Sequence, residues 1–235
     1  MILAYHSVNR ATEAEDPDRL VLSPELFEAQ VNLLRRNGYR FVTMDELLDD
    51  RRGAAPPPRT AILTFDDGWL DGLTVVLPML RRLGLPATFN VCPGMWGVRH
   101  DFVAGEAGRL LDRDDALELA RSGMELGSHT MSHPDLRALG DDALRAELTA
   151  SKAAVEELTE RPCRTLAYPF GLFDDRVERA AAAVGYEAAL AWQPGGPWRP
   201  LAMPRMPGPP RHGAGRLALK LLGLHRRKAP SPPED

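Results

Sequence analysis

The sequence has few of the features that mark disulfide-rich, membrane-spanning or nucleic-acid-binding proteins. Its two cysteines, Cys92 and Cys163, are too few and too far apart for a disulfide framework, so we interpret them as buried free thiols. No segment approaches the roughly 18 apolar residues of a membrane-spanning helix. The formal net charge of -4 gives no support for a nucleic-acid partner, which normally requires a basic face.

The first residues also lack the pattern of a secretory signal. Residues 1–5 (Met-Ile-Leu-Ala-Tyr) form only a short apolar run, and it contains no basic residue. We therefore expect a cytoplasmic protein. The length of 235 residues suits one α/β domain.

Apolar runs typical of buried strands alternate with helical patterns along the chain. We expect strands at residues 2–5, 60–65, 86–91, 124–127, 164–168 and 186–192, and helices at residues 75–83, 113–121, 141–158 and 174–184. Two more helices are expected after Ser23-Pro24 and at the capping box of residues 43–46. Repeated strand–helix units predict an α/β fold with a mostly parallel sheet covered by helices.

Polar residues follow four of the expected strands. These are His6, residues 66–68 (Asp-Asp-Gly), residues 129–133 (His-Thr-Met-Ser-His) and residues 168–171 (Tyr-Pro-Phe-Gly). Parallel βα folds place their sites at the carboxyl ends of strands. We therefore expect these four segments to meet at one face.

Two imidazoles and a carboxylate from these segments would suit a divalent metal ion. His129 and His133 have the i, i+4 spacing of a helical metal pair, and the same spacing also converges in some loops. Each motif alone also fits a structural role, the histidines in the core or on the surface and Asp-Asp-Gly in a turn. Together with Asp67 they resemble a catalytic zinc site or the ferrous site of an oxygenase. The strand–helix alternation disfavours the oxygenase, so we favour hydrolysis, in which a second carboxylate accepts a proton from water.

Three segments resemble the motifs of the polysaccharide deacetylases, the NodB-homology family of carbohydrate esterases. They are residues 64–68 (Thr-Phe-Asp-Asp-Gly), residues 129–133 and residues 167–171 (Ala-Tyr-Pro-Phe-Gly). The resemblance covers residues 1–207. It implies a single-domain, distorted (β/α)7 barrel, a Zn2+ ion or a similar ion such as Co2+, Ni2+ or Fe2+, and removal of acetyl groups from N-acetylated sugars.

The resemblance implies a role for each matching residue. Asp66 resembles the family's catalytic base. The residues that resemble its metal ligands are Asp67, His129 and His133. The backbone N–H of Phe170 stands where the family has an oxyanion donor, and such a donor contributes much of the rate enhancement.

The chain departs from the family pattern at two places. The third motif usually has an Arg that holds the catalytic base, where this chain has Ala167. Arg205 is our candidate replacement, and a simple surface Arg is the alternative. The Leu-x-His-type motif, which usually supplies the general acid near the end of the domain, is also missing.

The beginning of the chain offers a different general acid. Residues 2–6 (Ile-Leu-Ala-Tyr-His) resemble the poly-N-acetylglucosamine deacetylase branch, where this strand is permuted to the front. His6 would then protonate the leaving amine, and a histidine that only caps the first strand is the alternative. Tyr168 and Trp192 are candidates for stacking on a sugar, with burial in the core as the alternative.

We expect one deacetylase domain over residues 1–210, followed by a basic C-terminal helix and a disordered tail over residues 211–235. The helix packs on the domain or contacts a membrane surface. Our predicted function is metal-dependent N-deacetylation of an N-acetylated sugar or polysaccharide. The alternatives are deacylation of a small cytoplasmic N-acyl metabolite or nucleotide-linked sugar, and a non-catalytic glycan-binding module.

Overall fold

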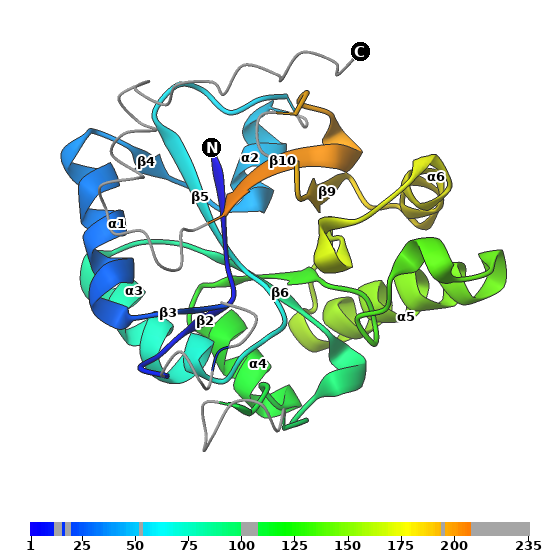
Figure 1. Ribbon diagram of the computed structural model, residues 1–235, viewed down its shortest axis with the longest axis horizontal. Helices are drawn as coiled ribbons and strands as arrows, with labels where there is room; N and C mark the ends of the chain where they lie inside the picture. Colours follow the sequence, from blue (N-terminus) through cyan, green and yellow to red (C-terminus); the bar gives the residue numbers. More distant parts are fainter. Residues whose placement is uncertain (12–15, 17–19, 52–53, 100–107, 194–195, 208–235) are drawn as a thin grey trace, which may run out of the picture.

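The computed structural model describes residues 1–11, 16, 20–51, 54–99, 108–193 and 196–207. Within these residues, seven parallel strands form a closed barrel (Figure 1). The strands are β1 (Ile2–Tyr5), β5 (Thr60–Phe65), β6 (Thr88–Val91), β7 (Glu125–Ser128), β8 (Thr165–Ala167), β9 (Ala188–Ala191) and β10 (Met203–Pro207). The ring closes because β1 pairs with β10 on one edge and with β5 on the other. The predicted distorted (β/α)7 barrel is therefore confirmed.

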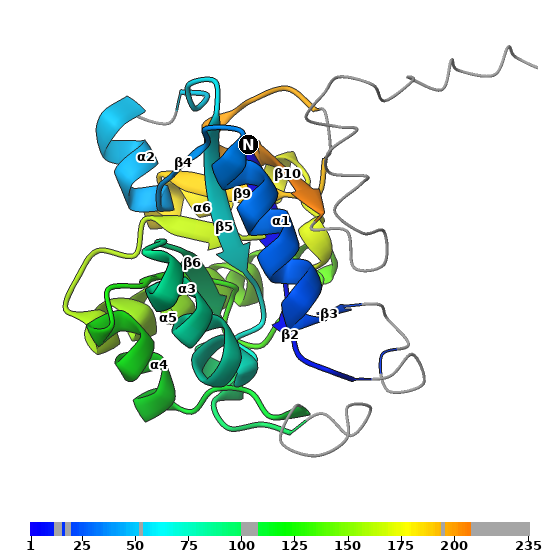
Figure 2. The same cartoon turned by 90° about the vertical axis from the view of Figure 1, so that its left-hand side faces the viewer.

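Helices surround the barrel, as Figures 1 and 2 show. They are α1 (Pro24–Arg36), α2 (Met44–Arg51), α3 (Leu77–Leu83), α4 (Arg113–Arg121), α5 (Asp141–Thr159) and α6 (Asp175–Val184). Side chains of the strands alternate between two apolar clusters, because successive residues of a strand point to opposite faces. On β1, Leu3 joins the large cluster under the outer helices, whereas Ile2 joins a smaller cluster with Met44 and Leu47 of α2. Helix α2 therefore covers the amino end of the barrel, and the carboxyl end is left for a site.

The barrel is uneven around its circumference. One edge of β5 is shared by two strands: β4 (Arg40–Phe41) pairs with its first residues, and β6 pairs with Thr64 and Phe65 at its end. Strands β7 and β8 meet at a single pair, Ser128 and Leu166. These irregular strand pairings make the barrel a distorted one.

Local sequence signals predicted most of these elements. Helix α4 covers the expected residues, and Thr43 forms the expected capping box with Glu46 through bonds of 2.9 and 3.2 Å. The expected helix at residues 75–83 is preceded by a π-helical segment, Gly72–Val76. Strand β10 was not predicted, because its two prolines cannot donate backbone hydrogen bonds and therefore argue against a central strand. This strand matters for the site, because its register with β1 brings Arg205 opposite Ile2.

Some expectations lie outside the described residues or stay untested. Residues 208–235, with the expected domain boundary, basic helix, tail and membrane contact, lie outside them. The part of the chain that the structure describes has no helix both long enough and apolar enough to span a bilayer. Cys92 and Cys163 are buried and free, as interpreted from the sequence. The cytoplasmic location stays a prediction.

Candidate active site

Three side chains that the sequence marked as metal ligands meet at the carboxyl end of the barrel. Asp67 follows β5, and the two histidines follow β7. The Oδ1 atom of Asp67 lies 3.3 Å from Nε2 of His129 and 3.5 Å from Nε2 of His133. Ligand atoms about 2.1 Å from a tetrahedral zinc ion lie about 3.4 Å apart. The spacing of these atoms therefore fits one small divalent ion.

The histidine ring nearest the core is fixed by a hydrogen bond to the backbone. Nδ1 of His129 lies 2.8 Å from the carbonyl oxygen of Ala167, and the ring is buried. Because a carbonyl oxygen can only accept, Nδ1 of His129 donates to it, and Nε2 is left as the nitrogen that faces Asp67. Burial raises the pKa of Asp67, but the His129 hydrogen bond and the neighbouring histidines outweigh it and hold this pKa well below its usual range. Asp67 is thus anionic at neutral pH, as a metal-ligating carboxylate has to be.

Left-handed backbone conformations gather in the three motifs. Positive φ angles of 58 to 70° occur at Asp67, Thr130, His133 and Phe170. Such angles in residues other than glycine cost about 1 kcal/mol or more each and persist only where the surroundings enforce them. Two of these four residues, Asp67 and His133, belong to the candidate metal site, so part of the backbone strain lies at that site.

Hydrogen bonds to Glu147 and Gly94 hold the loop that carries His133, and neither residue was predicted from the sequence to belong to the site. Oε2 of Glu147, on α5, accepts hydrogen bonds from the N–H groups of Met131 at 2.8 Å and Ser132 at 3.0 Å. The N–H of Gly94 donates to the Met131 carbonyl at 2.9 Å, and a Cβ at position 94 would lie only 2.6 Å from that oxygen. No local sequence pattern connects Glu147 or Gly94 with this loop.

The carboxylate of Asp66 is buried in a pocket of donors. Nη1 of Arg205 lies 2.8 Å from Oδ1 and 2.6 Å from Oδ2, and Nδ2 of Asn90 donates to Oδ1 at 2.8 Å. Burial raises the pKa of Asp66, but the charges of Arg205, His129 and His6 outweigh it, so the net pKa lies below its ordinary value. Asp66 is therefore ionised at neutral pH. The only sequence signal for Asn90 was its polar side chain within an apolar strand.

The remaining candidates differ in accessibility. His6 directly follows β1, and its neighbour Tyr5 accepts a hydrogen bond from the Asp66 N–H at 2.9 Å, so the two chain segments leave the barrel side by side. The ring of Phe170 is 60% exposed and lies 4.7 Å from the His133 ring, centroid to centroid. Among the described residues, none accepts a hydrogen bond from the Phe170 N–H. Trp192 is also exposed.

The prediction that Tyr168 contacts a substrate is wrong. Its side chain is fully buried, stacks on Phe173, and donates its hydroxyl hydrogen to the carbonyl oxygen of Leu201 at 2.9 Å. The chain turns at the end of β8 so that Tyr168 points into the core and Phe170 points to solvent. Tyr168 is thus a packing residue.

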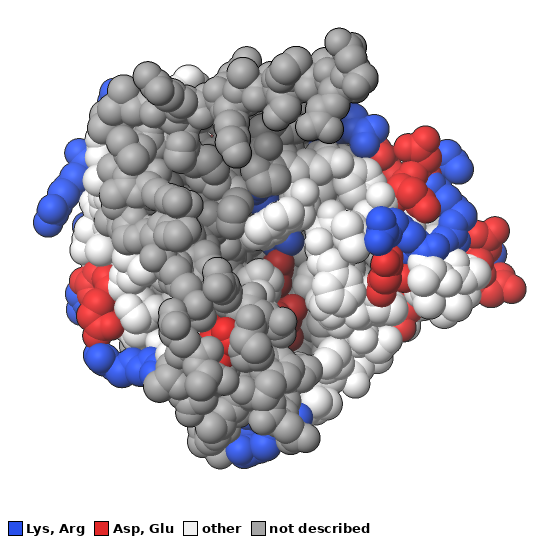
Figure 3. All heavy atoms as spheres, in the orientation of Figure 1, with Lys and Arg blue, Asp and Glu red and all other residues white. Residues whose placement is uncertain are grey.

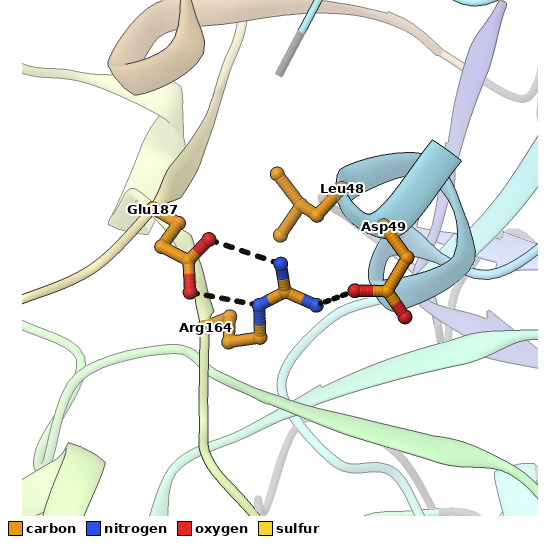
Figure 4. Close-up of a pocket in the computed structure, with 4 residues that line it drawn as sticks. All are labelled: Leu48, Asp49, Arg164 and Glu187. Carbon is orange, nitrogen blue, oxygen red and sulfur yellow. Dashed lines mark hydrogen bonds and ion pairs between the residues drawn. The ribbon is translucent and has the colours of Figure 1, made fainter. Parts of the chain in front are cut away.

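The structure also has a second depression, at the other end of the barrel. Figure 3 shows acidic side chains recessed in a hollow of the face seen in Figure 1. A pocket formed by Leu48, Asp49, Arg164 and Glu187 lies elsewhere (Figure 4). Arg164 and Glu187 directly precede β8 and β9, so this pocket is at the amino end of the barrel. Its charged groups pair with one another, and we assign it no catalytic role.

Comparison with known proteins identifies the family. The family model described as polysaccharide deacetylase matches residues 53–189, and the chain belongs to this family. The Bacillus subtilis (strain 168) protein YxkH is 27% identical over 198 residues, which cover 83% of this chain and 64% of that protein. A poly-beta-1,6-N-acetyl-D-glucosamine N-deacetylase of Escherichia coli (strain K12) is 30% identical over 145 residues, which cover 58% of this chain and 21% of that protein. The chain thus spans less than two thirds of the length of either relative.

The fold has a close counterpart among solved structures. The Streptococcus pyogenes deacetylase PplD, solved in complex with acetate, superimposes with a TM-score of 0.80 at 24% sequence identity. The match covers 94% of this chain and 96% of that chain. At this identity the likeness supports the fold, and the function has to be argued from the site.

Proposed function

We propose that this protein is a metal-dependent hydrolase that removes the N-acetyl group from an N-acetylated sugar or polysaccharide. The observation that carries the proposal is the pair of adjacent carboxylates with different surroundings. Asp67 faces two histidine nitrogens, whereas Asp66 faces Arg205 and Asn90. One carboxylate is thus arranged as a ligand and the other as a base. Membership of the polysaccharide deacetylase family and the named activity of the Escherichia coli relative support a sugar substrate.

Asp67, His129 and His133 would hold the ion, and the N2O donor set suits Zn2+, with Co2+, Ni2+ or Fe2+ as alternatives. When bound, such an ion would polarise the acetamide carbonyl and lower the pKa of water. The same donors bind the ion only when both histidines are neutral and the carboxylate is charged. The hydrogen bond from Nδ1 of His129 to the Ala167 carbonyl selects the tautomer in which Nε2 is the nitrogen available to the ion.

The other residues would move protons and stabilise charge. Asp66 accepts the proton of the attacking water, and Arg205 keeps this carboxylate ionised and in place. The N–H of Phe170 donates to the oxyanion that develops on the acetyl carbonyl oxygen. His6 gives a proton to the nitrogen as the C–N bond breaks. The products are acetate and the free amino sugar.

The test follows acetate release from N-acetylglucosamine oligomers and polymer after loading with each candidate ion. We expect activity with at least one ion and a loss of about 10²–10⁴-fold in Asp66→Asn. Asp49→Asn is the matched control, because Asp49 is an exposed carboxylate at the amino end and should leave the rate unchanged. Absence of acetate with every ion and sugar would refute the proposal. Release from small N-acyl compounds alone would favour the metabolite deacylase instead.

His6 needs a separate test because an acid acts only on a poor leaving group. His6→Ala should lose most activity on the acetamide, whose amine must be protonated to leave. The same variant should retain activity on an acetate ester of a nitrophenol, which leaves without a proton. Equal losses on both compounds would show that His6 has a structural role and not the role of an acid.

A further inference from the structure

The two oxygens of the Asp67 carboxylate have different partners. Oδ1 faces the histidine nitrogens at 3.3 and 3.5 Å. Oδ2 accepts a hydrogen bond of 3.0 Å from the indole Nε1 of Trp69. A carboxylate without such a donor can offer both oxygens to one ion, whereas here one oxygen is already engaged. The donor comes from the same loop, two residues further along the chain.

Trp69 is itself held firmly in position. Its side chain is 4% exposed and packs in a small cluster with Leu110 and Met95. The backbone on either side is paired with a segment far away in sequence: Leu111 N–H donates to the Gly68 carbonyl at 2.7 Å, and Leu70 N–H donates to the Arg109 carbonyl at 2.9 Å. The indole therefore cannot turn away from Asp67 without disturbing this packing.

We propose that Trp69 is a positioning residue that makes Asp67 a monodentate ligand. The inference rests on the metal site of the proposed function and adds a residue to it. Two imidazoles and one carboxylate oxygen occupy three positions around an ion, which leaves room for water and substrate. If Oδ2 also reached the ion, it would take up one of the remaining positions. A hydrogen bond to Oδ2 opposes that second contact and fixes the orientation of Oδ1.

The central test replaces Trp69 with Phe, which keeps an aromatic ring and removes the N–H donor. Zinc affinity is measured by competition with a coloured chelator, and no substrate is needed. We expect the affinity of Trp69→Phe to fall by about 10–100-fold, as for other residues that orient a ligand. Trp96→Phe is the matched control, because Trp96 gives no hydrogen bond to Asp67 and should keep the wild-type affinity.

Cobalt reports the geometry as well as the affinity. In the wild type, Co2+ should show the strong visible bands of low coordination number. In Trp69→Phe these bands should weaken, because the freed oxygen adds a ligand. A packing residue that did not orient Asp67 would leave the bands unchanged. If Trp69→Phe fails to fold, benzothienylalanine at this position keeps the ring shape and replaces only the N–H by sulfur.

The outcomes separate this inference from the proposed function. Wild-type zinc affinity and an unchanged cobalt spectrum in a folded Trp69 variant would overturn the inference and leave the metal site intact. Failure of the wild type to bind zinc or cobalt would overturn both. Weaker zinc binding together with weaker cobalt bands, seen only at Trp69, would support the monodentate arrangement.

Discussion

Charged side chains lie at both ends of the barrel, but their surroundings differ. At the carboxyl end, Asp66 and Arg205 are each 2% exposed and form an ion pair. At the amino end, Arg164 is 19% exposed and pairs with Glu187 and Asp49, which are 54% and 72% exposed (Figure 4). A buried ion pair pays a large desolvation penalty, whereas an exposed pair is screened by water. The carboxyl end therefore keeps charge where charge is unfavourable for stability, as the proposed role of Asp66 as a base requires.

The largest effect should come from removing the buried cation. In Arg205→Met, Asp66 stays buried without its partner, so we expect the free energy of unfolding to fall by about 3–5 kcal/mol. In Arg164→Met, solvent can replace the lost partner, so the fall should be about 1 kcal/mol or less. Urea denaturation of both variants measures the difference.

A double variant sharpens this comparison. Replacing both partners, as Asp66→Asn with Arg205→Met, removes the buried charge and should recover part of the stability lost in the single variant. If Arg205→Met and Arg164→Met lost the same stability, the two ends would not differ in the way that we describe.

The amino end also has a partly buried acid, Glu125, but its surroundings favour the neutral form. Burial raises the pKa of Glu125 from its ordinary 4.5 to about 8, the charge of Asp45 adds to this, and hydrogen bonds from the Asp45 N–H and from threonines oppose it. The folded protein thus binds this proton more tightly than the unfolded chain. The contribution of Glu125 to stability is therefore complete below pH 4.5 and falls by up to about 1.4 kcal/mol per pH unit as the pH rises toward about 8.

Glu125→Gln should remove this slope. Urea unfolding at several pH values between about 5 and 8 measures it. Glu187→Gln is the control, because the Arg164 hydrogen bond lowers the pKa of Glu187 and places its titration below this window. A slope that persisted in Glu125→Gln would assign the pH dependence to other groups.

The sequence predicted the candidate ligand residues better than the residues that hold them and Asp66 in place. Asp67 and the two histidines were predictable because each combines a recognisable residue type with a position just after a buried strand. The contact of Asn90 with Asp66 and that of Glu147 with the Met131 N–H were not, because they join segments 24 and 16 residues apart in sequence. Arg205 was only a candidate, because the prolines of β10 concealed the strand that brings it to the barrel.

Weakening the hydrogen bonds that hold the His133 loop should have a moderate effect on stability and on zinc affinity. Glu147→Gln keeps one acceptor oxygen but loses the charge that strengthens three hydrogen bonds to Met131 and Ser132. We expect a loss of about 1 kcal/mol in the free energy of unfolding and a decrease of about tenfold or less in zinc affinity. Glu157→Gln, on the same helix, is the control, since Glu157 is exposed and pairs only loosely with Arg113 at 3.7 Å. Equal zinc affinities in the two variants would contradict the role of Glu147.

The smallest expected effect is that of Trp192, an exposed aromatic residue just after β9, on substrate binding. Trp192 is 42% exposed, and it packs so closely against Gly171 that a Cβ there would lie 2.1 Å from the Trp192 Cβ. The Trp192 backbone and Cβ are thus held against Gly171, one residue from Phe170, and a sugar ring entering the site could stack on the exposed indole. Loss of an aromatic contact of about 0.5–1.5 kcal/mol predicts that Trp192→Ala raises KM for N-acetylglucosamine oligomers by about 2–10-fold with kcat little changed. Val98→Ala, another exposed apolar residue, is the control for a general surface effect. Because stacking adds binding without touching the reacting atoms, a fall in kcat at unchanged KM would instead place Trp192 among the residues that align the acetamide.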